Sequence, residues 1–166
     1  EIYTLSLHDA LPIYGTFIAG IICGQENREN DFTGIAPEAQ LIVIKLKPAE
    51  KELKDFFFIP DEKLVFSEAD IMRGIAFAEK YASQNNRPMV VCLALGCNNG
   101  SHNGTENLCE YIDEITSERG RTVVVGAGNE ANARHHYQGS TTAKPADVEI
   151  NVEKDLENKD SIYRFY

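Results

Sequence analysis

The residues whose types could do chemistry gather in two loops, at residues 96–104 and 126–130. Each loop follows an apolar run and is rich in glycine and asparagine, which leave backbone N–H and C=O groups open to a ligand. The second loop also carries Asn129, whose side-chain amide is a hydrogen-bond donor. Taken alone, an asparagine in such a loop can equally well cap backbone groups of the turn, so these residues leave both roles open.

The titratable residues are weaker candidates. His8–Asp9 is an adjacent polar pair with no orienting context, and His135–His136 beside Arg134 is expected to pack and hydrogen-bond in a loop rather than bind a metal. The 4 cysteines form no CxxC pair and have no histidine at zinc spacing, so we expect buried free thiols and no metal site. The absence of a GxGxxG or P-loop motif indicates no nucleotide cofactor, and no other cofactor is expected.

The elements that must position the two loops alternate between helical and extended patterns. Apolar runs at residues 41–44, 89–95 and 122–125 are too continuous for one-sided burial and predict parallel strands covered on both faces. Helices are expected between them, and right-handed crossovers then give a three-layer α/β sandwich. Ligands of such sheets bind beyond the carboxyl ends of the strands, which is where the two loops lie.

Local signals predict where the helices begin and end. An apolar helix at residues 16–23 is expected to pack closely at Gly20 and to end in a left-handed Gly24. The capping-box pattern at residues 67–70 predicts the start of a helix whose buried residues are Ile71, Ile75, Ala78 and Ala82. The next helix is expected to be capped by Thr105 and to end at Gly120. Its expected buried residues are Leu108, Ile112 and Ile115. Residues 47–66 are expected to form a surface insertion that packs Phe56, Phe57 and Phe58 back on the domain, a substrate or partner contact being the alternative.

Three segments in the same order resemble the subtilisin-like serine peptidases. GTFIAG at residues 15–20 resembles the segment that follows the catalytic histidine of that family, and TGIAP at residues 33–37 is similar to its turn into a core strand. VVVGAGNE at residues 123–130 matches the segment that ends in the oxyanion asparagine, which would be Asn129. The resemblance implies that this amide stabilises the negative oxygen of the tetrahedral intermediate.

The resemblance also implies which residues form the cleft. One wall is expected at the strand end that is similar to the family's S-L-G, and the other at the small residues before Asn129, both offering backbone groups to an extended peptide. The implied substrate-binding residues are Ala94, Leu95, Gly96, Gly126, Ala127 and Gly128. The alternative for the second set is that small residues only permit tight backbone packing.

The segments CLALGCNNGSHNGT and GNEANARHHYQG are similar to the spore-germination (Csp-type) branch of the family, several members of which lack an intact triad. In this chain Tyr14 occupies the position of the catalytic histidine, and tyrosine, with an ordinary pKa of ~10, is a poor base at neutral pH. The family's aspartate and serine are not found in the 166 residues, and Ser140 is a poor substitute, so this polypeptide is expected to be inactive. Because Tyr14 adjoins an adapter-like segment, we interpret it as an artefact rather than a native residue.

Three functions compete. The first is a fragment of a serine endopeptidase that acts on peptide or protein substrates; the second is a pseudoprotease that acts as a binding or regulatory module. The third is an unrelated flavodoxin-like binding domain, which should carry a phosphate-binding loop that is not seen. The net charge of −10 argues against nucleic acid as a partner, and no apolar run approaches the ~20 residues of a membrane span.

The expected organisation has three parts. Residues 1–13 read as a non-native leader that resembles a translated sequencing adapter, residues 14–140 as a partial subtilisin-like domain truncated at both ends, and residues 141–166 as the start of a β-rich insertion or extension with a C-terminal hairpin. Location is left open by the residues; the family alone suggests an extracellular or spore-associated protein.

Overall fold

A computed structural model describes residues 13–97 and 100–128 of the chain. The helices are α1 (Ile13–Cys23), α2 (Lys51–Phe56), α3 (Glu68–Gln84) and α4 (Asn107–Thr116), and the strands are β1 (Met89–Leu93) and β2 (Arg121–Val125). The hairpin expected near the C-terminus lies outside the described residues. The observed α/β architecture, with helices on a parallel strand pair, agrees with a subtilisin-like fold.

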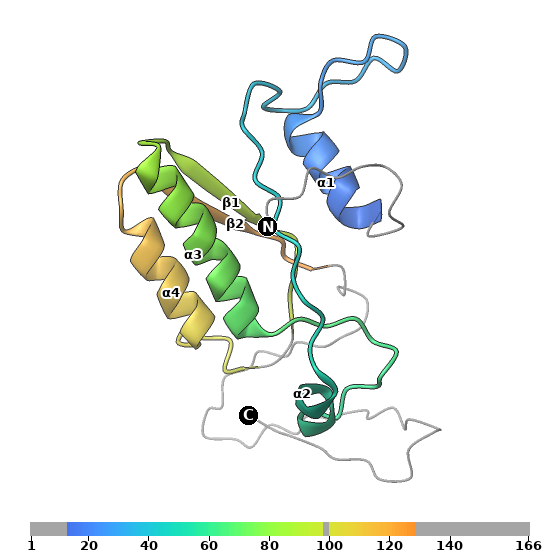
Figure 1. Ribbon diagram of the computed structural model, residues 1–166, viewed down its shortest axis with the longest axis vertical. Helices are drawn as coiled ribbons and strands as arrows, with labels where there is room; N and C mark the ends of the chain where they lie inside the picture. The colour runs from blue at the N-terminus through green and yellow to red at the C-terminus, as the bar shows by residue number, and fades with distance from the viewer. Residues whose placement is uncertain (1–12, 98–99, 129–166) are drawn as a thin grey trace, which may run out of the picture.

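The centre of the fold is the parallel pair β1–β2. The two strands are in register from Met89 opposite Arg121 to Leu93 opposite Val125. Helices α3 and α4 lie side by side over one face of this pair (Figure 1). The core between the layers consists of Ile75, Ala78, Ala82, Met89 and Ile115, each less than a tenth exposed. The predicted stripes are confirmed in part. Their core members are Ile75, Ala78, Ala82 and Ile115, whereas Ile71, Leu108 and Ile112 are half-buried, and Met89 is the first residue of β1.

The other face of the strand pair is open. Val90 is 70% exposed and Val124 is 52% exposed, and Cys92 is also exposed. The expectation of strands covered on both faces is therefore wrong for the described residues, because no helix in them packs on this face. The open face leaves Cys92 exposed, and Cys97 in the loop after β1 is exposed as well, where buried thiols were expected.

Residues 41–44 are not a strand, which corrects the expectation of a third parallel strand. The segment has no regular secondary structure; it lies alongside α3 and does not pair with β1 or β2. A side chain on Gly74 of α3 would meet the Ile44 and Leu46 side chains at 3.1 and 3.8 Å, and Gln40 donates to the Tyr81 hydroxyl at 2.9 Å. Leu41 and Ile44 nevertheless stay 45% and 38% exposed, so the run contacts a helix without entering the core. Periodicity cannot distinguish this outcome from a buried strand.

The helix starts are held differently from the predicted caps. Ser67 occupies the N-cap of α3 without a side-chain hydrogen bond, and Glu106 rather than Thr105 occupies the N-cap of α4. The exposed N–H of Leu108 instead donates to Glu68 Oε1 at 2.7 Å. A carboxylate from the start of α3 therefore caps α4, which also complements the positive end of the helix dipole.

The aromatic triplet does not pack back on the domain. Phe56 and Phe58 are 63% and 59% exposed, and Phe57 is exposed as well. Residues 48 and 66 form an isolated antiparallel bridge that closes the segment, and Lys54 Nζ donates to the carbonyl oxygens of Asp61 and Lys63 at 2.8 and 2.7 Å. The contacts of Lys54 thus join the two sides of this segment, while the phenyl rings are exposed. The expectation that they pack against the domain is wrong.

Helix α1 ends in a tight crossing of backbones. Gly34 N–H donates to the Gly24 carbonyl at 2.8 Å, and the amides of Ile35 and Ala36 donate to the carbonyls of Ile21 and Ile22 at 3.0 and 2.7 Å. This is how the GTFIAG helix and the GIAP turn meet. Two expectations are wrong here. Gly24 does not adopt the left-handed conformation, and Gly20 does not pack closely, since nothing lies within 4 Å of a Cβ at Gly20.

We predict opposite effects of alanine at two glycines near this crossing. A Cβ at Gly34 would lie 2.4 Å from the Gly24 nitrogen, so Gly34→Ala should destabilise the α1 region by about 1–3 kcal/mol, the usual cost of overpacking. Gly20→Ala enters open space inside a helix and should stabilise it by about 0.5–1 kcal/mol. Amide hydrogen exchange across residues 13–36 measures both. Equal protection in the two variants would contradict the crossing.

Candidate active-site edge

The two candidate loops leave the strand pair at the same edge. Because β1 and β2 are parallel, residues 94–96 and 126–128 both follow carboxyl ends of strands. Gly126 N–H donates to the Leu93 carbonyl at 3.2 Å, which continues the pairing one residue past β2. The structure therefore brings together the two segments that the sequence identified separately. We call residues 94–96 and 126–128 the strand-end edge.

The strand-end edge is open and lacks side-chain bulk. Leu95 is 39% exposed, Gly96 and residues 126–128 are exposed, and Ala94 is half-buried. A Cβ added at Gly96, Gly126 or Gly128 would meet no atom within 4 Å, so among the described residues these glycines do not serve tight packing. Apart from Gly126, the backbone amides of the edge donate no hydrogen bond within the described residues. Free main-chain groups beside a strand end are what an added peptide strand requires.

Tyr14 lies in the first turn of α1 and is 54% exposed. Helix α1 packs against no other helix or strand of the described residues, and Figure 1 shows it apart from the α3–α4 layer. No hydrogen bond joins Tyr14 to the strand-end edge in the part of the chain that the structure covers. Asn129 lies outside the described residues, so its role stays a prediction.

The loop between β1 and α4 is braced by a single carboxylate. Glu106 Oε1 accepts hydrogen bonds from the backbone N–H and the hydroxyl of Ser101, both at 2.8 Å. Chiefly the Ser101 backbone N–H, and then its hydroxyl, lower the pKa of Glu106 below its ordinary value. A Cβ at Gly100, which has a φ of +110°, would lie 2.9 Å from the same carboxylate oxygen. Sequence analysis missed this brace, which a Gly-Ser turn five residues before a glutamate could have suggested.

We predict that this brace weakens in acid. Because the folded pKa of Glu106 lies below the unfolded value, its carboxylate stabilises the loop above about pH 4.5 and ceases to do so as the pH falls through the lowered folded pKa. The backbone amide resonance of Ser101 should follow that titration. The Glu106→Gln variant should show no such step, whereas Glu118→Gln should retain it. An Ser101 titration unchanged in Glu106→Gln would contradict the brace.

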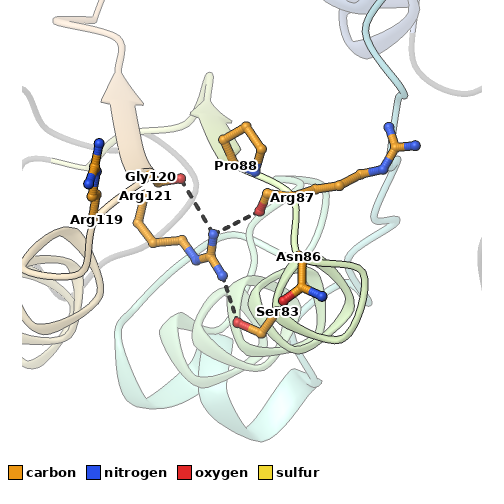
Figure 2. Close-up of a pocket in the computed structure, with 7 residues that line it drawn as sticks. All are labelled: Ser83, Asn86, Arg87, Pro88, Arg119, Gly120 and Arg121. Carbon is orange, nitrogen blue, oxygen red and sulfur yellow. Dashed lines mark hydrogen bonds between the residues drawn. The ribbon is translucent and has the colours of Figure 1, made fainter.

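At the amino-terminal ends of β1 and β2, opposite the strand-end edge, a pocket of about 420 Å³ surrounds Arg121 (Figure 2). The Arg121 side chain is only 8% exposed; it pairs with Glu79 at 3.5 Å and donates to the Arg87 carbonyl at 2.9 Å and to the Ser83 hydroxyl at 2.6 Å. The Arg87 and Arg119 side chains extend away from one another in Figure 2. This arginine therefore connects the carboxyl-terminal part of α3 to the amino-terminal ends of β1 and β2. Its position at the start of an apolar run did not indicate this role.

The strand-end edge, the parallel pair and the tied GTFIAG–GIAP segments together define a subtilisin-like α/β domain. The chain belongs to the subtilase family (Peptidase_S8), whose family model matches residues 9–152. Among solved structures it is similar to the CspB protease of Clostridium perfringens, with 30% sequence identity and a TM-score of 0.56. These findings confirm the resemblance to the subtilisin-like family and its Csp branch.

The similarity to CspB covers 70% of this chain and 23% of that chain, so the present chain spans less than a quarter of the length of that protease. No curated protein sequence matches the chain. Within the described residues, none of the helices combines the length and apolar character that crossing a membrane demands.

Proposed function

We propose that this chain is a segment of a longer serine endopeptidase that hydrolyses peptide bonds. The strand-end edge would bind the substrate backbone as an added strand, with Ala94, Leu95 and Gly96 on one side and Gly126, Ala127 and Gly128 on the other. Asn129, directly after that second wall, would donate its amide to the oxyanion of the tetrahedral intermediate. The nucleophilic serine and the aspartate would come from parts of the longer protein beyond these residues.

The observation that carries the proposal is the parallel register of β1 and β2. It puts residues 94–96 and 126–128 on one edge, where Gly126 N–H reaches the Leu93 carbonyl at 3.2 Å. Membership of the subtilase family and the similarity to CspB support peptide or protein as the class of substrate. Exposed glycines in the second wall leave room for a substrate side chain.

A pseudoprotease is the second candidate, and Tyr14 favours it. If tyrosine is native at this position, the triad has no base that can accept the serine proton at neutral pH, since a phenol oxygen is a poor proton acceptor. The protein would then keep the strand-end edge for binding without turnover. Sequencing the genomic DNA across codon 14 determines which residue is native.

The test is active-site labelling of the full-length protein with a fluorophosphonate, which reacts only with an activated serine. With histidine at position 14, whether native or introduced as Tyr14→His, we expect covalent labelling that an excess of a chloromethyl ketone peptide blocks. The Tyr14 form should label far more slowly. Absence of labelling in the histidine form, with an aspartate and serine present in the full-length chain, would overturn the endopeptidase proposal.

A further inference from the structure

The turn at residues 101–105 concentrates hydrogen-bond donors on one side-chain carbonyl. Asn103 Oδ1 lies 3.0 Å from the Thr105 backbone nitrogen, 2.6 Å from the Thr105 hydroxyl and 2.6 Å from the Ser101 hydroxyl. The Ser101 hydroxyl has a single proton, which it shares between this oxygen and Glu106 Oε1 at 2.8 Å. The Asn103 amide nitrogen donates no hydrogen bond within the described residues, so the carbonyl end is held while the NH₂ end is not.

Asn103 is followed by Gly104, which has no side chain to hinder its backbone nitrogen. Gly104 has a φ of +81°, and no atom lies within 4 Å of the place a Cβ would take. The whole turn is exposed to water. A glycine nitrogen beside an asparagine can approach the side-chain carbonyl carbon without the steric barrier that a β-carbon would add.

We propose that Asn103–Gly104 is a site of intramolecular deamidation that the turn itself promotes. The Gly104 nitrogen gives its proton to water and bonds to Asn103 Cγ, while the electron pair of the carbonyl moves onto Oδ1. The Thr105 N–H and hydroxyl donate to that oxygen, and the Ser101 hydroxyl, whose proton it shares with Glu106, lies 2.6 Å from it, as donors surround the oxyanion of an acyl-transfer intermediate. When the intermediate collapses, the Cγ–Nδ2 bond breaks and the nitrogen leaves as ammonia with a proton from water.

The product of this step is a five-membered succinimide between residues 103 and 104. Water then adds to one of its two carbonyl carbons and opens the ring to aspartate or isoaspartate, so the net reaction consumes water and releases ammonia. A new carboxylate results in the loop that leads from the strand-end edge to α4, close to the Glu106 carboxylate. The reaction needs neither a catalytic serine nor a bound ligand, and it is independent of the proposed peptidase function.

The test compares the folded 166-residue chain with the same chain in urea at one pH and temperature. Mass spectrometry of tryptic peptides follows the exchange of NH₂ for OH, and fragment ions distinguish Asn103 from Asn99, which also precedes a glycine. Because a hydrogen bond contributes about 1 kcal/mol net, we expect Asn103 to convert about three- to tenfold faster in the folded chain. An equal or slower rate in the folded chain would overturn the proposal, because the turn would then protect the asparagine.

Thr105→Val tests the mechanism at the oxygen, since it removes one donor and nearly keeps the side-chain shape. We expect it to slow conversion at Asn103 about three- to tenfold in the folded chain and to leave the rate in urea unchanged. Thr122→Val, on the open face of the strand pair, is the matched control and should leave both rates as they are. If Thr105→Val loses the helical circular dichroism signal, Ser101→Ala takes its place with the same expectation; an unchanged folded-state rate in the folded variant contradicts the role of the donors.

Discussion

If the proposed endopeptidase function holds, replacing Asn129 by alanine in the full-length protein is expected to lower kcat by about 10²- to 10³-fold, the effect that removing one oxyanion-hole donor has in subtilisin. The amide acts on the oxygen only when it becomes negative, so the loss should fall on kcat rather than on KM. Steady-state hydrolysis of a chromogenic peptide by the histidine-14 form measures both constants.

Two further variants make this result specific. Asn129→Asp keeps the shape but replaces a donor by an acceptor, and should be at least as inactive as the alanine variant, whereas Gln84→Ala at the end of α3 should leave kcat unchanged. A large rise in KM with an unaltered kcat in Asn129→Ala would mean that the amide holds the substrate or the loop and does not serve the oxyanion. That outcome would contradict the assignment of Asn129.

Replacing Ile75 by alanine is expected to cost about 2–5 kcal/mol of unfolding free energy, a large part of the stability of a domain of this size. Ile75 is 2% exposed and packs with Met89 of β1 and Ile115 of α4. Truncation would leave a cavity where both helices meet the strand pair, and the layers cannot close on it without breaking other contacts. Urea unfolding followed by circular dichroism measures the change.

A neighbouring residue on the same helix provides the control. Phe77 is 44% exposed, so Phe77→Ala removes more atoms but loses much less burial, and should cost well under half as much as Ile75→Ala. Ile75→Leu conserves volume and should cost less than about 1.5 kcal/mol. If the phenylalanine variant proves the less stable of the two, the core does not lie between α3, α4 and the strand pair.

Sequence reasoning was most successful where a local pattern and its burial agree. The stripe from Ile75 through Ala82 predicted α3 and its buried face, and the β-branched run before Gly126 predicted β2. It failed where an apolar run took neither a strand partner nor a place in the core. Residues 41–44 read as a core strand, yet Ile44 packs over Gly74 of α3.

The candidate site follows the same division. The two loops were predicted from glycine and asparagine next to apolar runs, and the parallel pairing that joins them at one edge was predicted from the alternation of helices and strands. The bonds that hold these parts were not: Glu68 caps a helix 40 residues along the chain, and Arg121 reaches Ser83 across 38 residues. Such contacts depend on which side chains the packed layers bring together, and no local spacing encodes that.

The order of residues by itself determined the family, the parallel β1–β2 pair and the small, open residues at its carboxyl edge, because periodicity and short motifs express local backbone preference and burial. Tertiary structure alone decided that Gly24 and Gly34 cross closely, that the phenylalanine triplet faces outward and that distant carboxylates and a nearly buried arginine hold the helix ends. Each of these features arises from the free energy of packing and of satisfying polar groups across segments far apart in the chain, which exists only once those segments are folded together.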